Sequence, residues 1–445
     1  MNIILPYLIS LLIGYFFTDF LLKKRGVSLS LRICLAAGIG LSISAEIVFY
    51  SFILFNQFHK GFVLCVHGVL LIGLFCARYF FSKQPSSFLV DTKEISRRDY
   101  AWIFLLLSAF VLSFFQANLY PFGGWDAWSV WNLKAKFLFV NDTEWKKMFD
   151  PLLWRSSPHY PLLLPLINVW GWIFLSEPSS ATPLATSLVF TFLTVAFLFF
   201  SLKIFIKNIF AFLAAFLILT LPYFVKLTTD QYSDILVAYF ILTSLVCSFV
   251  AVKKKIYEML FCAGLCLGFL SFVKVEGLAA GMMMICLIMI YIFFQNDFSY
   301  RRSLILLLGG FGLAALPSLI FYLFYAPQNQ TFINGLASQT QPSDFTRLKI
   351  IASFFILEIK SPKWSFIWPL LLAGIGLGFK NCFRRDIIIL PIFFGLYLGV
   401  TAFYYFLNTY FEIGWWLSVT LSRILLSILP AVIFWIFYSL WQEEA

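Results

Sequence analysis

The chain has 445 residues, of which 61% are hydrophobic and 12% are charged. This composition excludes a water-soluble globular protein, because too few polar side chains remain to cover its surface. The net charge of +11 does not indicate a nucleic-acid partner, since the 32 Lys and Arg residues lie mostly between apolar runs and not in one basic stripe.

Apolar runs long enough to cross a membrane recur along the whole chain. A hydrocarbon core of about 30 Å needs about 20 residues of α-helix, and runs that are apolar on every side exclude a transmembrane barrel. We therefore expect an all-α integral membrane protein with about thirteen transmembrane helices. The expected spans are 2–22, 31–57, 61–82, 101–120, 184–202, 209–225, 235–252, 257–273, 278–294, 304–324, 364–380, 387–407 and 423–440.

Basic residues between these spans predict the orientation, because Lys and Arg are retained on the cytoplasmic side of a membrane. A single assignment, with the N-terminus outside and the C-terminus inside, places the main basic clusters in the cytoplasm. These clusters are Lys23-Lys24-Arg25, Arg97-Arg98, Lys203 with Lys207, Lys253-Lys254-Lys255, Arg301-Arg302 and Arg384-Arg385. The long segments 121–183 and 325–363 then face outward, and we expect the function on that side.

The run 161–175 is also apolar, but counting it as a span would move Lys253-Lys254-Lys255 to the outside. Trp170 and Trp172 are typical of membrane interfaces, so we expect this run to lie along the outer membrane surface. Segment 121–183 is then a first long outer loop with interfacial helices. The alternative, in which 161–175 crosses and another expected span does not, remains open.

The loop after the fourth expected span carries a carboxylate among aromatic residues. Asp126 follows the break at Gly123-Gly124, and Trp125, Trp128 and Trp131 recur every three residues in one stripe. An amphipathic interfacial helix explains the tryptophans. A carboxylate that is partly desolvated beside anionic headgroups holds a proton more strongly, as a general base for a hydroxyl group requires. An ordinary exposed loop aspartate is the alternative.

Further polar side chains are expected at the same face. They are Lys134, His159, Tyr160, Asp230, Tyr232, Asp234, Lys274, Glu276 and Arg423. Each has a structural alternative: Asp234 as a helix cap, Lys274 and Glu276 as an ion pair, Arg423 as a snorkelling residue. With three histidines in the chain a zinc site is not expected. Asp126, Glu276 and His159 could hold a divalent cation, although their spacing does not require one.

Several short motifs occur in order between residues 100 and 435. They are Gly124-Trp-Asp-Ala-Trp-Ser-Val-Trp131, His159-Tyr-Pro161, Tyr232-Ser-Asp234, Lys274-Val-Glu-Gly277 and Ser422-Arg-Ile-Leu-Leu426. In this order the chain resembles the GT-C superfamily of polytopic glycosyltransferases, in particular the bacterial branch related to protein O-mannosyltransferases and lipid A aminoarabinose transferases. The resemblance implies one polytopic domain over 1–445, with a GT-C-like core at 101–445 preceded by a three-helix extension at 1–100.

The resemblance also implies an activity. A sugar on a polyprenyl phosphate would be transferred to a hydroxyl of a glycan, lipid or protein at the outer face of the bacterial inner membrane. Asp126 corresponds to the active-site acid of the first outer loop, and the second acid would be Asp230 or Asp234. We further expect Lys134, Lys274 and Arg423 to bind the donor phosphate. The expected sugar and acceptor contacts are Trp125, Trp128, Trp131, His159, Tyr160, Asp230, Tyr232, Asp234 and Glu276.

Two other classes of protein fit the composition. A transporter or flippase of lipid-linked saccharide would be equally polytopic, but it predicts polar groups near the membrane midplane and an inverted repeat. A non-catalytic scaffold for other envelope enzymes predicts no dependence on Asp126. We expect no cofactor other than a possible divalent cation.

Overall fold

The computed structural model describes residues 3–22, 25–81, 97–140, 142–295, 299–337 and 345–441, and this part of the chain is helical without strands. Lys23, Lys24 and residues 338–344 lie outside the described ranges. Ten described helices are long and apolar enough to cross a membrane, which confirms the expected all-α, multi-pass membrane protein. They are α1 (Ile4–Leu22), α2 (Leu29–Phe55), α3 (Lys60–Phe81), α4 (Arg97–Leu119), α7 (Ala181–Leu202), α10 (Asp234–Lys254), α12 (Val275–Phe293), α13 (Tyr300–Phe324), α18 (Ile389–Leu407) and α19 (Ile413–Trp441).

Three of the thirteen expected spans are shorter or broken. The segment expected at 209–225 forms α8 (Asn208–Leu219) and α9 (Pro222–Asp230), which meet at a bend of 57°. Pro222 explains the break, because it has no amide hydrogen to continue the helical bonding of α8. Helix α11 (Glu258–Val273) has 16 residues, and α16 (Ile367–Leu377) has 11.

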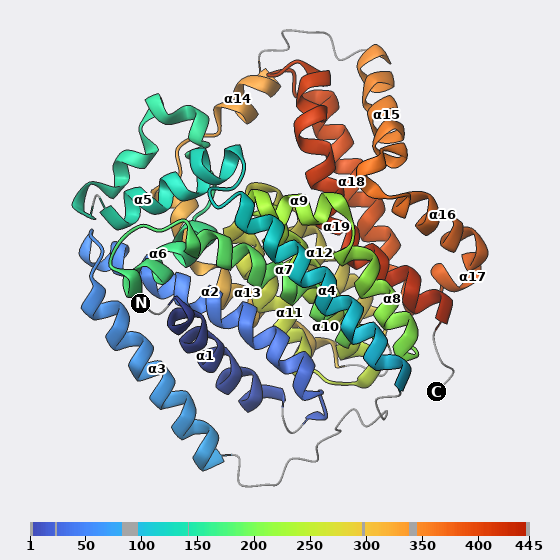
Figure 1. The fold of residues 1–445 in the computed structure, drawn as a ribbon, viewed down its shortest axis with the longest axis horizontal. Coiled ribbons are helices and arrows are strands. Elements are labelled where there is room, and N and C mark those ends of the chain that lie inside the picture. The colour runs from blue at the N-terminus through green and yellow to red at the C-terminus, as the bar shows by residue number, and fades with distance from the viewer. Residues whose placement is uncertain are drawn as a thin grey trace.

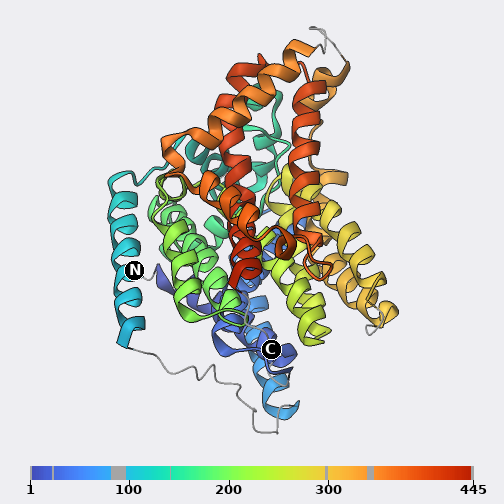
Figure 2. The same ribbon diagram turned by 90° about the vertical axis from the view of Figure 1, so that its right-hand side faces the viewer.

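The remaining elements are short. They are η2 (Ala127–Trp131), α5 (Asn132–Val140), η3 (Asp142–Phe149), η4 (Pro151–Ser156), α6 (Leu163–Leu175), α14 (Gln330–Ala337), α15 (Phe345–Lys360), η5 (Pro362–Trp364) and α17 (Phe379–Cys382). In Figure 1, α14, α15 and the facing ends of α18 and α19 project above the other helices. The same orange and red segments rise at the top of Figure 2.

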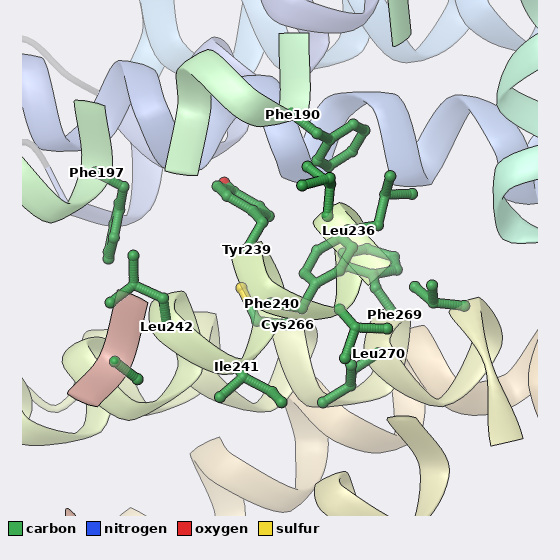
Figure 3. Close-up of a cluster of buried hydrophobic side chains, with 14 of the residues drawn as sticks. Phe190, Phe197, Leu236, Tyr239, Phe240, Ile241, Leu242, Cys266, Phe269 and Leu270 are labelled. Carbon is green, nitrogen blue, oxygen red and sulfur yellow. The ribbon is translucent and has the colours of Figure 1, made fainter. Parts of the chain in front are cut away.

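Helix α10 is the centre of the bundle. Every residue of it from Asp234 to Ala251 is buried, against α7, α11, α12 and α19. Figure 3 shows part of this core, with Tyr239 and Phe240 of α10 between Phe190 of α7 and Phe269 of α11. This packing fixes the ends of α10 and α11, which carry polar residues.

Glycines allow α11 to lie close to α13. A Cβ atom on Gly264 would lie 2.1 Å from the carbonyl oxygen of Leu307, and one on Gly310 would lie 2.3 Å from that of Phe261. Small residues that let two backbones approach are typical of helix pairs in membranes, where packing replaces the hydrophobic effect as the driving force. Helix α11 is therefore held by protein on several sides although it is short.

Helix α6 differs from the sequence expectation, because its tryptophans do not face lipid headgroups. Trp170 is buried, donates from Nε1 to the carbonyl oxygen of Pro6 at 3.1 Å, and stacks on His67 at 3.9 Å. Trp172 is also buried and donates to the carbonyl oxygen of Ser179 at 2.9 Å. The helix packs on α2, α5, α7 and α1 instead. The first three helices provide this contact, which local sequence patterns do not reveal.

Candidate functional site

The turn that carries Asp126 is fixed to the turn between α9 and α10. The amide of Gly124 donates to the carbonyl oxygen of Asp230 at 3.0 Å. Gly123 has a φ of 72°, and a Cβ atom there would lie 2.8 Å from the same carbonyl oxygen. Only glycine fits such a left-handed conformation at this close approach without strain. The glycines therefore bring Asp126 to the start of α10.

Five charged residues from four segments form a continuous network at this end of the bundle, which we name the charge network. Nη1 of Arg423 donates to Oδ2 of Asp126 at 2.7 Å, and Nε donates to Oδ2 of Asp234 at 2.9 Å. Nη2 of Arg423 also lies 2.8 Å from Oδ2 of Asp234. Lys274 donates from Nζ to Oδ1 of Asp234 at 3.2 Å, and this ammonium lies 3.5 Å from Oε1 of Glu276.

Exposure varies along the charge network. The side chain of Asp234, in the middle, is 3% exposed, and Arg423 and Lys274 are nearly as buried. Asp126 is 23% exposed and Glu276 is 40% exposed, so the two terminal acids are the accessible ones. A buried carboxylate needs charged partners, and Asp234 has two. The centre of the network is therefore structural in part, whereas a ligand can reach Asp126.

Tyr232 contacts both Asp126 and Arg423. The guanidinium carbon of Arg423 lies 4.6 Å from the centre of the Tyr232 ring, and the amide of Asp126 donates to the Tyr232 hydroxyl at 3.4 Å. Burial, with the negative charge of Asp126, raises the pKa of Tyr232 to about 12. The hydroxyl is consequently protonated at neutral pH.

Tyr160 lies between two lysines. Its ring centre is 5.8 Å from Nζ of Lys274 and 5.7 Å from Nζ of Lys134, and the ring stacks on Trp131 at 5.6 Å. Lys134 is completely buried and donates to the carbonyl oxygens of Ser157 and Tyr160, at 2.7 Å and 3.1 Å. Burial lowers its pKa. The expected role of Lys134 as a phosphate ligand does not fit this position, because its ammonium holds the Tyr160 turn inside the protein.

The tryptophans of the expected stripe separate into two environments. Trp125 and Trp128 are more than half exposed and form an edge-to-face pair with ring centres 4.5 Å apart. Trp131 is fully buried. The reason is η2, a π-helical turn that directly follows Asp126 and changes the helical spacing. Two exposed aromatic faces thus lie beside Asp126.

His159 and Asp230 lie next to the charge network without joining it. His159 packs edge-to-face on Tyr160 at 4.8 Å, and burial together with the charge of Lys134 lowers its pKa to about 4. Asp230 forms an ion pair with Lys226. Of the two candidates for the second acid, Asp234 is the one that shares Arg423 with Asp126.

Several buried polar atoms here have no hydrogen-bond partner among the described residues. They are Oγ of Ser129, Nε1 of Trp131, Oγ of Ser233, Oε2 of Glu276 and Nη2 of Arg423. Buried polar atoms in native proteins are generally paired with protein or water, so ordered water is expected beside these atoms.

A second polar cluster beside Arg423 was not singled out in the sequence. Nζ of Lys363 donates to Oγ of Ser422 at 2.6 Å and to Oε1 of Glu358 at 2.8 Å, and it lies 5.2 Å from the centre of the Tyr223 ring. Trp364 donates to the other oxygen of Glu358 at 3.0 Å. Nothing in the sequence around 358–364 marks these residues, since their partners are distant in the chain.

Within the described ranges, no group of three or more His, Cys, Asp or Glu side chains is arranged to hold a metal ion. Asp126 and Asp234 are bridged by a guanidinium instead. No family model, curated protein or solved structure matches the chain.

Proposed function

We propose that the chain is a glycosyltransferase that moves a sugar from a polyprenyl phosphate to a hydroxyl of a glycan, lipid or protein, with inversion and with Asp126 as the general base. The observation that carries this proposal is the meeting of Asp126 and Asp234 at Arg423, at one end of the bundle and beside exposed aromatic faces. Such a site combines an acceptor for a proton, cations for a phosphate and apolar faces for a sugar ring or lipid.

The proposed site lies one membrane thickness from a basic cluster. Helix α10 has 21 residues, which corresponds to about 30 Å, with Asp234 at its start and Lys253 and Lys254 at its end. Because clustered basic residues mark the cytoplasmic side, the proposal places the charge network at the outer face, the periplasmic face in a bacterium.

We also propose that thirteen segments cross the membrane, including the three short or broken ones. Polar contacts near the two ends of each of these three segments support this course. Helix α11 begins at Glu258, which pairs with Arg25 and Arg302 at the basic end, and it ends at Lys274 in the charge network. This support is independent of helix length, and burial against α10, α12 and α13 compensates for a length below a full span.

The other two short or broken segments also run between the basic end of the bundle and the end that carries the charge network. The segment from Lys363, beside Arg423, to Asp386, which pairs with Lys253 at 2.5 Å, contains α16 and α17. The bent pair runs from Asn208, which donates to Asp99 at the start of α4, to Asp230 at the turn of Asp126. This course retains an odd number of crossings, with the N-terminus outside and the C-terminus inside.

In the proposed reaction the acceptor hydroxyl gives its proton to Asp126 while its oxygen forms a bond to the anomeric carbon. The bond between that carbon and the phosphate oxygen breaks, and its electron pair leaves with the polyprenyl phosphate. Arg423 and Lys274 stabilise the negative charge that develops there. Loss of one such donor typically costs about 3 kcal/mol, or about 10²-fold in rate.

The location of the network favours this activity over transport. A carrier of lipid-linked saccharide is expected to bind at the midplane of the membrane, on interrupted helices. Four residues of the charge network instead lie at the ends of helices, after α4, at the start of α10 and between α11 and α12, and Arg423 reaches them from within α19, which begins ten residues earlier than the expected span at 423. Ionisable groups at such a depth are reachable by both a lipid phosphate and a soluble or lipid-bound hydroxyl.

Mass spectrometry of envelope glycans and lipid-linked sugars tests the proposal. A strain without the gene should lack one sugar, and the wild-type gene should restore it. Asp126→Asn should fail to restore it at equal membrane abundance. Glu144→Gln is the matched control, since it removes the same charge from an exposed residue that pairs with Lys147, outside the proposed machinery, and it should restore the sugar. An unchanged glycan profile in the deletion strain would refute the proposed activity.

A further inference from the structure

All three guanidinium nitrogens of Arg423 lie close to acids in this structure, and two of them, Nε and Nη1, donate hydrogen bonds, whereas the buried Nη2 makes none with a described residue. Its Nε and Nη2 atoms face Asp234, and its Nη1 atom donates to Asp126 at 2.7 Å. Each of the three guanidinium nitrogens therefore faces a carboxylate. Nη2 is buried, so a phosphate that reaches Arg423 from the more exposed side, at Nη1, replaces Asp126 there.

The two acids are held unequally. Asp234 faces two nitrogens of Arg423, accepts a further bond from Lys274 and is 3% exposed. Asp126 has one charged partner, Nη1 of Arg423, among the described residues, and it is 23% exposed. An incoming anion therefore displaces Asp126 much more readily than Asp234.

The rest of Arg423 would stay in place during such an exchange. Asp234 holds the Nε edge, and the ring of Tyr232 lies 4.6 Å from the guanidinium carbon. The planar guanidinium presents its donors in a fixed fork that suits phosphate as well as carboxylate. Replacement of Asp126 by a phosphate oxygen exchanges one charge-assisted hydrogen bond for another, so the exchange requires little rearrangement.

We propose that Asp126 is an internal placeholder for the phosphate of the lipid-linked donor at Nη1 of Arg423. This inference rests on the proposed function and adds an order of events to it. Donor binding moves the phosphate onto Nη1 and releases Asp126 from its ion pair. The released carboxylate then accepts the proton of the acceptor hydroxyl, so the base becomes available only when the donor is bound.

Because Asp126 and the donor phosphate compete for Nη1 of Arg423, removal of Asp126 should raise the affinity for polyprenyl phosphate. Asp126→Asn removes the competing anion, and a charge-assisted hydrogen bond contributes enough that polyprenyl phosphate should bind about tenfold more tightly. Glu144→Gln removes an equal charge from an exposed residue that pairs with Lys147 and leaves the contacts of Arg423 unchanged, so its affinity should stay within about threefold of wild type. The full-length proteins would be titrated in detergent with a long-chain polyprenyl phosphate, with tryptophan fluorescence as the signal.

Two further ligands separate the sources of the phosphate. Polyprenol, which has no phosphate, should bind equally to all three proteins. Inorganic phosphate should bind wild type weakly, because it lacks the lipid contacts, and Asp126→Asn more tightly. If inorganic phosphate binds as tightly as the lipid, the site is one for free phosphate and the lipid assignment is wrong.

The failure of the placeholder and the failure of the proposed function give different results. If wild type binds polyprenyl phosphate no better than polyprenol, the proposed function fails. If wild type binds the phosphate lipid and Asp126→Asn binds it no more tightly than Glu144→Gln does, the placeholder is refuted while the proposed function stands.

A second measurement uses the unsubstituted protein, in case Asp126→Asn does not fold. A carbodiimide with an amine modifies accessible carboxyl groups, and peptide mass spectrometry reports the modification of Asp126. Polyprenyl phosphate should increase this modification severalfold and polyprenol should not. Equal or lower modification with the phosphate lipid would overturn the exchange.

Discussion

Asp126 and Arg423 are 297 positions apart in the chain, and the hydrogen bond between them joins the turn after α4 to the last helix. Arg423 extends the same contact to the start of α10 through Asp234. The geometry of the candidate site thus depends on the packing of three distant segments, and substitutions within it have consequences for stability as well as for activity.

Arg423→Met should destabilise the protein strongly. The substitution leaves Asp234, which is 3% exposed, with Lys274 as its remaining charged partner in the network and leaves Asp126 unpaired. Removal of one partner from a buried ion pair typically costs about 3–5 kcal/mol. Thermal unfolding in detergent measures this loss. Arg155→Met, which removes an exposed arginine that packs on Trp154, is the control and should leave the unfolding temperature nearly unchanged.

Gly123→Ala should both destabilise the turn and displace Asp126. A Cβ atom at this position, which has a φ of 72°, would lie 2.7 Å from Cβ of Ala127 and 2.8 Å from the carbonyl oxygen of Asp230. The left-handed conformation alone costs about 1 kcal/mol for a residue with a side chain. Sugar transfer in cells and the thermal unfolding temperature should both decrease.

Gly309→Ala is the matched control for that substitution. Gly309 lies inside α13, and a Cβ atom there meets nothing within 4 Å. Alanine favours a helix over glycine by about 1 kcal/mol, so this variant should be as stable as wild type or slightly more stable. Equal behaviour of the two alanine variants would contradict the steric account of the turn.

Stability should decrease in mild acid because of His159. Its pKa is about 4 in the folded protein and 6.5 for an ordinary histidine, so the unfolded chain binds a proton first as the pH falls. The free energy of unfolding should therefore decrease from about pH 6.5 to about pH 4. In His159→Gln this decrease should be smaller, as unfolding temperatures at several pH values would show. An identical slope in both proteins would mean that the histidine is not buried as described.

The sidedness of the charge network can be measured by cysteine labelling. In a variant without the natural cysteines, Leu152→Cys in η4, which is 88% exposed, should react with a membrane-impermeant reagent in intact cells. Lys254→Cys, at the far end of α10, should react only after the membrane is opened. The reverse pattern would place the proposed site in the cytoplasm.

Much of the fold follows from the sequence, because apolar runs and the basic residues between them determine where helices begin and end. The same rule placed Asp126, Asp234, Lys274 and Arg423 at the ends of apolar runs on one side, and the structure brings them together. Sequence spacing alone does not show whether Asp230 or Asp234 is the second acid of the site, since this depends on which carboxylate reaches Arg423 of α19.

Other features depend on contacts between distant segments. The sequence predicts Lys134 as a phosphate ligand because no local pattern shows that the turn of Ser157 and Tyr160 closes around it. Trp170 resembled an interfacial residue because its partners, Pro6 and His67, belong to the first three helices. The pairing of Lys363 with Ser422 was missed for the same reason.

The most direct test of the central claim is the restoration of sugar transfer by Asp126→Asn in a strain that lacks the gene. The variant should fold and reach the membrane at wild-type abundance, because Asp234 still pairs with Arg423 and Lys274. We predict that it restores less than about one hundredth of the transfer, since a general base and its charge are lost. Restoration to the wild-type level would contradict the account.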